Sequence, residues 1–339
     1  MKPKGITIRD VARAAAVSTA AVSQAFNSAG RLRTETREKI LAVARRLKYH
    51  PNRYAKNLAM GKSKTLGIVV SDIENPFFAV VIKNFEAHAR RYGYEVIASE
   101  TGYDVTLMRR AAERMIEQNV SGVAIMTSEM NEGWLEEILG RGIPVTGLDL
   151  DLISDHASNI KINYLSAMQQ LIEHLYHLGH RSIAYVGGRP RLRNVKSRHE
   201  GYLRSMTALG LEPGPIIPGN QRLDGGYSAG LSILEMSPRC TAVIGMNDLT
   251  AIGVINAFME SGVRVPQDIS VTGFDNTYLA AYFVPRLTTV DIHADILGRT
   301  AADALFDSLA ARTSGGKEYA IKYDLVVGKS TGPAPERVA

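Results

Sequence analysis

Cysteine is nearly absent from this sequence of 339 residues: Cys240 is the only one, so a disulfide bond within the chain is excluded. A chain so poor in cysteine is typical of a reducing compartment, and we expect it in the cytoplasm. No apolar run approaches the ~18 residues of a membrane span, and the N-terminus lacks the apolar segment of a signal peptide. We therefore expect no membrane contact.

Two zinc-binding motifs are missing as well. HExxH and paired CxxC motifs do not occur, so no zinc site is predicted, and no cofactor is expected. One catalytic pattern does match: "GYSAG" at residues 226–230 fits G-x-S-x-G, with Asp275 and His293 following in hydrolase order. The polar stretch "GNQRLDG" before Ser228 is not the buried strand that this nucleophile requires. We interpret the chain as a non-enzyme and keep a hydrolase using Ser228 as the alternative from another class.

Acidic residues are scarce at one end of the chain. Residues 1–64 hold 15 Lys and Arg but only three Asp and Glu, a net charge of +12, whereas the remaining residues sum to −6. A basic head on a mildly acidic body predicts a polyanionic partner for the head alone.

Three short helices are predicted in this head. Thr7 and Asp10 have the spacing of a capping box for a helix that begins at Ile8. After a turn, Ser18 is placed to cap a helix over residues 19–27. A third helix begins near Thr34, and its apolar stripe consists of Ile40, Leu41, Val43, Ala44 and Leu47.

Two helices joined by a three-residue turn are typical of a helix-turn-helix domain, whose second helix enters the DNA major groove. The segment "VSTAAVSQAFN" is nearly uncharged and rich in small residues, which lets its outer face approach base edges closely. Thr19, Ala20 and Gln24 lie on that face; Thr and Ala can contact a thymine methyl, and Gln can pair with adenine. The alternative is a small three-helix interaction module, which the charge distribution disfavours.

Residues 50–62 are predicted to form a short hinge helix, with Pro51 at its start and Gly61 at its end. Leu58 is its main large apolar residue and lies between Lys56 and Lys62. Such a helix is too short to be stable alone, and its leucine suits an apolar wedge for a minor-groove step. A basic interdomain linker is the alternative.

Three blocks of sequence carry a resemblance to a known family: "TIRDVARAAAVSTAAVSQAFN", "RLRTETREKILAVARRLKYHPNRYAKNLA" and "VPQDISVTGFDN". They closely resemble the lactose-repressor (LacI/GalR) family of bacterial transcription regulators, over essentially the whole chain. The resemblance implies that the head reads half of a near-palindromic operator and that the hinge helix inserts Leu58 at its centre. The residues then expected to contact DNA are Thr7, Ser18, Thr19, Ala20, Ser23, Gln24, Asn27, Asn52, Arg53, Ala55 and Leu58.

From residue 66 onward, short runs rich in Val and Ile alternate with helical stretches. The runs are "LGIVV", "EVIAS", "GVAIM", "PVTGL", "SIAYVGG", "TAVIGM" and "ISVTGF". This alternation predicts an α/β body of doubly wound parallel sheets in two series. The resemblance implies a periplasmic-binding-protein-like body of two subdomains over residues 63–339, with crossovers near 162, 291 and 325, after a helix-turn-helix domain over 1–49.

Ligands in such sheets bind beyond the carboxyl ends of the strands. Polar and aromatic residues that follow the strands there give a candidate effector site: Asn75, Phe77, Phe78, Asp149, Arg198, Gln221, Asn247 and Asp275. By resemblance, Asp149, Arg198, Asn247 and Asp275 match positions that bind effector in sugar-responsive members. Singly, each is equally well explained as a cap or loop residue.

Carboxylate, amide and guanidinium groups beside Phe rings suit a polyhydroxylated ring, so a small sugar or sugar derivative is the expected effector. Gln221 stands where the family's purine-binding member has an aromatic residue, which argues against a nucleobase. The basic run "RPRLRNVKSRH" leaves a phosphorylated or acidic sugar open. We expect a repressor that binds double-stranded DNA as a homodimer or tetramer. A nucleoside ligand or a protein corepressor is the runner-up.

Overall fold

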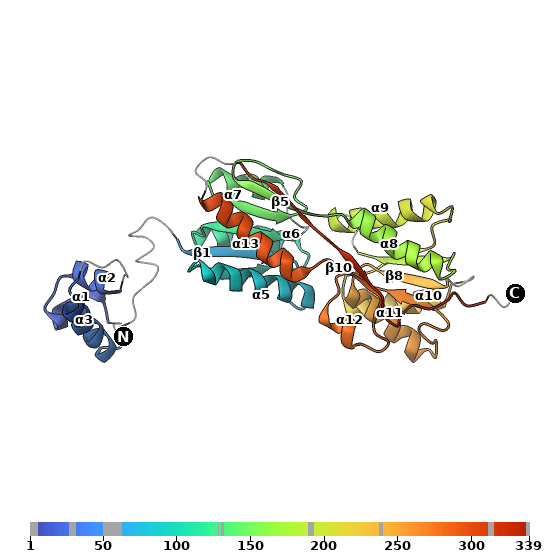
Figure 1. The fold of residues 1–339 in the computed structure, drawn as a ribbon, viewed down its shortest axis with the longest axis horizontal. Coiled ribbons are helices and arrows are strands. Elements are labelled where there is room, and N and C mark those ends of the chain that lie inside the picture. The colour runs from blue at the N-terminus through green and yellow to red at the C-terminus, as the bar shows by residue number, and fades with distance from the viewer. Residues whose placement is uncertain are drawn as a thin grey trace. The chain divides into compact units, whose positions relative to one another are not determined.

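The computed structural model describes residues 6–26, 32–49, 63–127, 129, 132–188, 193–236, 240–310 and 315–336. The chain divides into two compact units, Met1–Ser63 and Lys64–Ala339 (Figure 1). The segment predicted to form the hinge helix, 50–62, lies outside the described residues. No described helix is long and apolar enough to span a membrane.

The first unit contains helices α1 (Ile8–Ala15), α2 (Thr19–Phe26) and α3 (Thr34–Arg46). The Asp10 carboxylate accepts hydrogen bonds from the backbone nitrogen and hydroxyl of Thr7, at 2.9 and 2.7 Å, and so fixes the start of α1. The α1 helix ends where Ala16 adopts a left-handed φ of 55°. The core of this unit is small and consists of Val11, Ala12, Ala15, Val22, Ala25, Ile40 and Ala44.

The turn between α1 and α2 is fixed at both ends. Val17 N donates to the Ala12 carbonyl at 3.0 Å, and Ala21 N donates to Ser18 Oγ at 3.1 Å. Ser18 therefore caps α2, as its position in the sequence predicts. The turn directs Val22 inward, so the opposite side of α2 faces outward.

The second unit consists of two lobes, each built on a parallel sheet. The first lobe has six strands in the order β11-β5-β4-β3-β1-β2. Their bounds are β1 Thr65–Val70, β2 Glu95–Glu100, β3 Gly122–Met126, β4 Val145–Leu148, β5 Ala157–Ile162 and β11 Glu318–Ile321. Helix α5 (Pro76–Arg91) packs against α13 (Ala294–Ala310), and α6 (Val105–Glu117) against α7 (Glu132–Gly140), so helices cover both faces (Figure 1).

The second lobe has four parallel strands in the order β7-β6-β8-β9. They are β6 Ile183–Gly187, β7 Ile216–Pro218, β8 Ala242–Gly245 and β9 Ser270–Thr272. Helices α8 (Tyr164–His177) and α9 (Arg193–Ala208) pack as one pair, and α10 (Leu223–Leu234) and α11 (Asp248–Glu260) as the other. The short α12 (Tyr278–Tyr282) follows β9.

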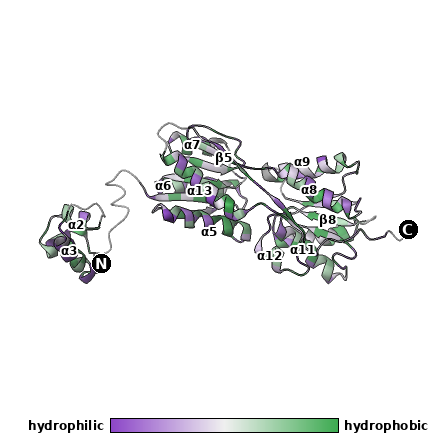
Figure 2. Cartoon of the chain, viewed as in Figure 1, coloured by the Kyte–Doolittle hydropathy of each residue, from purple (hydrophilic) through white to green (hydrophobic). Residues whose placement is uncertain are grey.

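The chain passes between the lobes after β5, after β10 (Thr289–Asp291) and between β11 and β12 (Asp324–Val326). The last two crossover segments lie side by side, because β10 and β12 pair antiparallel as a separate two-stranded sheet. The central strands β1, β3 and β6 are buried almost throughout, and much of the interior of both lobes is coloured hydrophobic in Figure 2. All seven predicted strand runs are confirmed, and the prediction of a helix-turn-helix head followed by a body of doubly wound parallel sheets is confirmed.

Candidate ligand-binding and nucleic-acid sites

The outward face of α2 presents the residues expected to read DNA bases. Thr19, Ala20, Ser23 and Gln24 are exposed, whereas Val22 and Ala25 of the same helix are fully buried. Thr7 and Ser18 are also exposed, at the starts of α1 and α2. Asn27, Asn52, Arg53, Ala55 and Leu58 lie outside the described residues. A helix with a neutral, short-chained outer face can lie close to base edges without burying a charge.

The eight residues predicted for effector binding come together around one cavity in the second unit. Fifteen residues line this cavity, which is partly open to solvent. The predicted members are Asn75, Phe77, Phe78, Asp149, Arg198, Gln221, Asn247 and Asp275, and the others are Ser71, Tyr103, Met126, Thr127, Leu148, Tyr164 and Ile292. Both lobes contribute, and most members follow the carboxyl end of a strand.

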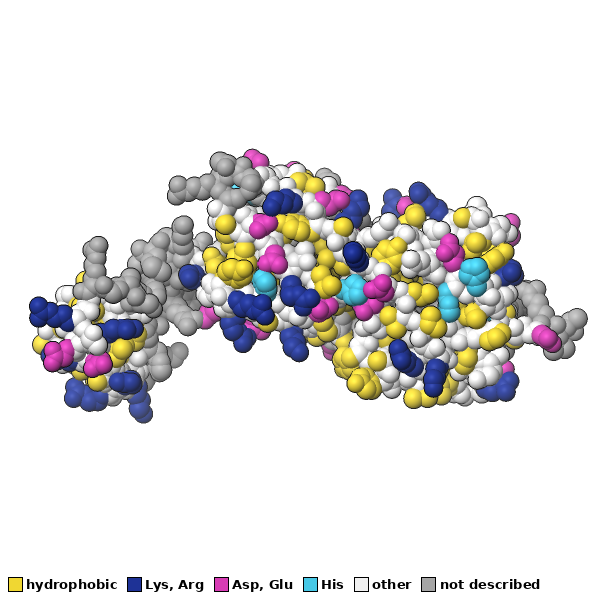
Figure 3. All heavy atoms as spheres, in the orientation of Figure 1, with side chains coloured by type: hydrophobic (Ala, Val, Ile, Leu, Met, Phe, Trp, Pro, Cys, Tyr) yellow, Lys and Arg dark blue, Asp and Glu magenta, His cyan; other side chains and the backbone are white. Residues whose placement is uncertain are grey.

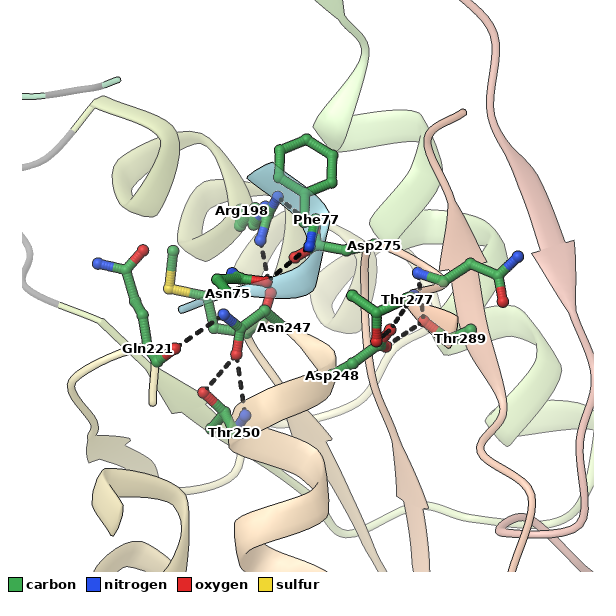
Figure 4. A network of polar contacts seen from close by, with 12 residues as sticks. Asn75, Phe77, Arg198, Gln221, Asn247, Asp248, Thr250, Asp275, Thr277 and Thr289 are labelled. Carbon is green, nitrogen blue, oxygen red and sulfur yellow. Dashed lines mark hydrogen bonds and ion pairs between the residues drawn. The ribbon is translucent and has the colours of Figure 1, made fainter. Parts of the chain in front are cut away.

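Arg198 lines the cavity from the second lobe and points toward Asp275 (Figure 4). Its guanidinium donates to the Met246 carbonyl at 2.6 Å and to Asp275 Oδ1 at 3.2 Å. It also lies over the rings of Phe274 and Tyr164, with its carbon 4.3 and 4.9 Å from the ring centroids. Only 5% of Arg198 is exposed, so these contacts fix a charge of the basic run that lines the cavity.

Two carboxylates of the cavity are poorly solvated. Burial raises the pKa of Asp275 to about 6, while the Arg198 charge lowers it. Burial also raises the pKa of Asp149 to about 6, although Asp149 Oδ1 accepts from Ile162 N at 3.3 Å. Within the described chain, Asp149 Oδ2 and Arg198 Nε are buried without a hydrogen-bond partner. Such atoms are costly unless a ligand or water satisfies them.

The amides in the cavity hold its backbone. Asn247 Nδ2 donates to the Gln221 carbonyl at 2.9 Å, and its Oδ1 accepts from the nitrogen and hydroxyl of Thr250 at 2.9 and 2.7 Å. Asn75 Oδ1 caps α5 by accepting from Phe77 N at 3.0 Å. Both amides are therefore helix caps, and both also line the cavity.

Backbone strain is concentrated at this cavity. Tyr103, Asp149, Gln221 and Asp275 line it and have positive φ values of 61°, 52°, 68° and 107°. Residues other than glycine adopt such values at a cost, and they persist where the surrounding structure and the function require them.

Asp248 does not line the cavity but holds residues next to it, Thr277 and Thr289 (Figure 4). It is fully buried and accepts from the nitrogen and hydroxyl of Thr277 at 2.6 and 3.0 Å and from the hydroxyl of Thr289 at 2.6 Å. Burial, together with the nearby charge of Asp275, raises the pKa of Asp248 to about 7. Asp248 thus holds the segment after β9 that presents Asp275.

The sequence pattern missed seven of the lining residues. Ser71 and Thr127 directly follow β1 and β3, so the rule of strand ends identifies them too. Tyr164 begins helix α8 and Ile292 follows strand β10, two places where the chain crosses between lobes. Only the tertiary arrangement brings these two to the cavity.

Ser228 lies within helix α10, five residues after its start, and its hydroxyl donates to the Asp224 carbonyl at 3.0 Å. His293, the other hydrolase candidate, pairs with Asp324 at 2.9 Å and lies at a crossover. The arrangement gives no strand–turn–helix nucleophile, so it offers no support for the hydrolase alternative.

Comparison with known proteins matches two family models to the chain. Residues 7–52 match the bacterial regulatory proteins of the lacI family, and residues 172–331 match a periplasmic binding protein-like domain. The HTH-type transcriptional repressor PurR of Pasteurella multocida (strain Pm70) is 31% identical over 334 residues, covering 96% of this chain and 98% of that protein. The PurR of Erwinia tasmaniensis is 32% identical over 342 residues, covering 98% of both.

Solved structures agree with this assignment. The lac repressor dimer bound to operator and the anti-inducer ONPF superposes with a TM-score of 0.84 at 28% identity, covering 97% of this chain and 100% of that one. A LacI family transcriptional regulator from Enterococcus faecium with bound ribose superposes with a TM-score of 0.72 at 25% identity, covering 79% and 99%. The chain belongs to the lacI family of bacterial regulatory proteins and is a DNA-binding transcriptional repressor.

Proposed function

We propose that this repressor is controlled by a small sugar or sugar derivative bound in the cavity between the two lobes. The observation that carries the proposal is the pair of buried, unpartnered polar atoms, Asp149 Oδ2 and Arg198 Nε, on residues that line the cavity. One is an acceptor and the other a donor, and a hydroxyl group can satisfy either.

The remaining lining suits a ring with both hydroxyl groups and an apolar face. Asp275 and Asn247 add polar atoms, while Phe77 and Phe78 form an edge-to-face pair with centroids 5.1 Å apart. The relative from Enterococcus faecium holds ribose within the same fold. A polyol makes many charge-assisted hydrogen bonds with such groups, which supports carbohydrate as the ligand class.

A nucleoside is the second candidate. It is favoured by the relatives that are named PurR and by the Phe rings, on which a base could stack. Gln221 lines the cavity at the position where the resemblance implies an aromatic residue in a purine-binding member, and this favours the sugar.

We propose further that residues 1–49 form the helix-turn-helix domain, 50–62 a hinge helix and 63–339 the ligand-binding body. Because each chain carries a single helix-turn-helix, two chains are needed to read a near-palindromic operator. The second lobe exposes apolar side chains on and after α12, with Tyr278, Tyr282 and Val284 exposed by 61, 83 and 75%. Hydrophobic side chains are visible on this surface in Figure 3. We assign it to the dimer interface.

A thermal-shift screen of the full chain tests the ligand class. The panel contains pentoses, hexoses, disaccharides and sugar phosphates, with nucleosides and nucleobases beside them. Stabilisation by a sugar that is lost in Arg198→Ala supports the proposal. Stabilisation by nucleosides alone would mean that the ligand is a nucleoside and not a sugar. Stabilisation by a sugar that persists in Arg198→Ala would mean that the sugar binds elsewhere in the chain.

A further inference from the structure

One ion pair joins the two lobes directly. Arg222 Nε of the second lobe lies 2.9 Å from Asp72 Oδ2 of the first, and the two residues are 150 positions apart in the chain. The other ion pairs among the described residues lie within one lobe or at the crossovers. This pair therefore bridges the lobes away from the covalent connections.

Both partners are sequence neighbours of cavity-lining residues. Asp72 follows Ser71, and Arg222 follows Gln221. Each is also held locally: Asp72 Oδ1 accepts from Glu74 N at 2.9 Å, and Arg222 N donates to Asn220 Oδ1 at 3.0 Å. If a ligand displaces Ser71 or Gln221, the neighbouring partner of the ion pair is displaced with it through the backbone.

The wall at Gln221 is especially well placed to transmit such a displacement. Its carbonyl accepts the bond from Asn247 Nδ2, and its own φ is 68°. A ligand that binds Asn247 or the Gln221 side chain acts on a strained backbone whose next residue is Arg222. A movement of the cavity lining at Gln221 should therefore move Arg222 and its ion pair as well.

The burial of the two partners suits a contact that breaks and reforms. The Asp72 side chain is 4% exposed, whereas 44% of the Arg222 side chain is exposed. The guanidinium can therefore move into solvent at little cost, whereas the carboxylate stays at its place in the first lobe. A half-exposed pair contributes a modest free energy, enough to bias two states without locking one of them.

We propose that Asp72 and Arg222 form a latch that sets the resting separation of the lobes, and that a ligand in the cavity shifts the repressor by favouring the latched or the unlatched state. The second part rests on the proposed ligand site, whereas the first does not. Neither residue lines the cavity, so the pair regulates the ligand response without contacting the ligand.

The test measures the distance between the lobes in the full chain without ligand or DNA. Spin labels are attached to cysteines introduced at Lys83 on α5 and Arg204 on α9, both exposed, while the buried Cys240 is not labelled. We expect Arg222→Gln to move the distance distribution toward longer distances, with about a two- to fivefold rise in the open-to-closed ratio. Arg222→Lys should restore much of the closed population.

Matched variants separate a latch from a general disturbance. Arg264→Gln removes a surface pair with Asp268 inside the second lobe and should leave the distribution unchanged. Asp72→Asn should reproduce Arg222→Gln, and the double variant should open the lobes no further than either single one. The melting temperature of Arg222→Gln, compared with wild type, confirms that it folds. Identical distance distributions for wild type and Arg222→Gln would overturn the latch, whatever ligand the cavity binds.

Discussion

Asp149 combines a strained backbone, a raised pKa and a carboxylate oxygen without a partner, so it destabilises the ligand-free chain. Its folded pKa of about 6 lies above the ~3.9 of an unfolded aspartate. Between these values the folded chain binds more protons, so the contribution of Asp149 to the free energy of unfolding falls as pH rises. The loss is complete above about pH 6.

We therefore predict that Asp149→Asn stabilises the ligand-free chain at pH 8 by about 1–3 kcal/mol and that this gain shrinks toward pH 4. Thermal or denaturant unfolding of both proteins at several pH values measures it. Asp155→Asn, which replaces an exposed carboxylate close by in the sequence, is the control. Its free energy of unfolding should change with pH as that of wild type does. If the free energies of unfolding of wild type and Asp149→Asn changed equally with pH, the raised pKa of Asp149 would be wrong.

At the other end of the chain, Gln24 is exposed on α2 with no described partner to hold it in the protein. We expect Gln24→Ala to change the preferred base at one operator position, at a cost of about 1–3 kcal/mol on the wild-type site. Arg53→Ala should instead weaken binding to all sequences alike and flatten its salt dependence. Selection of binding sites from random DNA measures the preferred bases. An unchanged motif for Gln24→Ala would show that Gln24 does not read a base.

At the level of elements, α2 has a side-chain cap at its N-terminus. Ser18 Oγ accepts from Ala21 N, and Ser18→Ala should cost about 1 kcal/mol in the stability of the head. Hydrogen exchange of the α2 amides in the full chain reports it, because the head is a compact unit of its own and local stability differs between such units. Ser23→Ala, on an exposed mid-helix residue, should leave the exchange unchanged or slow it. Equal exchange in Ser18→Ala and wild type would mean that the cap is dispensable.

Elements with clear hydrophobic patterns were predictable, and those with buried polar residues were not. The Val- and Ile-rich runs correspond to seven strands of the structure. Strand β5, "ASNIKI", does not stand out because Ser158 and Asn159 are buried within it. Ser158 Oγ accepts from Lys317 N, and Asn159 Oδ1 from Leu150 N, so tertiary partners remove the cost of burying them. Strands β10 and β12 have three residues each, too few to show a hydrophobic pattern, and they pair with one another in the tertiary structure.

At the scale of the whole molecule, the residues that follow strands could be assembled into a site from the sequence, whereas contacts between lobes could not. All eight predicted effector residues line one cavity, because carboxyl ends of parallel strands meet at one edge of a sheet. The Asp72–Arg222 pair joins loops 150 residues apart, and no local pattern marks it. Whether the cavity binds a sugar stays a prediction.

The proposed dimer is a property of the whole molecule, and the α12 surface should control its formation. We predict that Tyr282→Lys combined with Val284→Lys converts the dimer to monomer at micromolar concentration, since two charges replace apolar side chains exposed by 83 and 75%. Sedimentation equilibrium measures the change, and operator affinity should fall with it. Ile216→Lys, on the opposite edge strand of the same sheet, is the control and should remain dimeric. A dimeric double variant would place the interface elsewhere.

We propose that a ligand held by Arg198 and Asp275 changes the affinity of the head for DNA. This proposal is tested by operator affinity with and without the best-binding sugar, for wild type, Arg198→Ala and Asp275→Ala. Each substitution removes a charge-assisted anchor worth about 1.5–3 kcal/mol, so ligand affinity should fall ten- to a hundredfold. If the ligand releases DNA, both variants should keep wild-type operator affinity and lose the response at ligand concentrations that saturate wild type. If it is a corepressor, both should fail to bind operator at those concentrations. An undiminished ligand response in both variants would contradict the account.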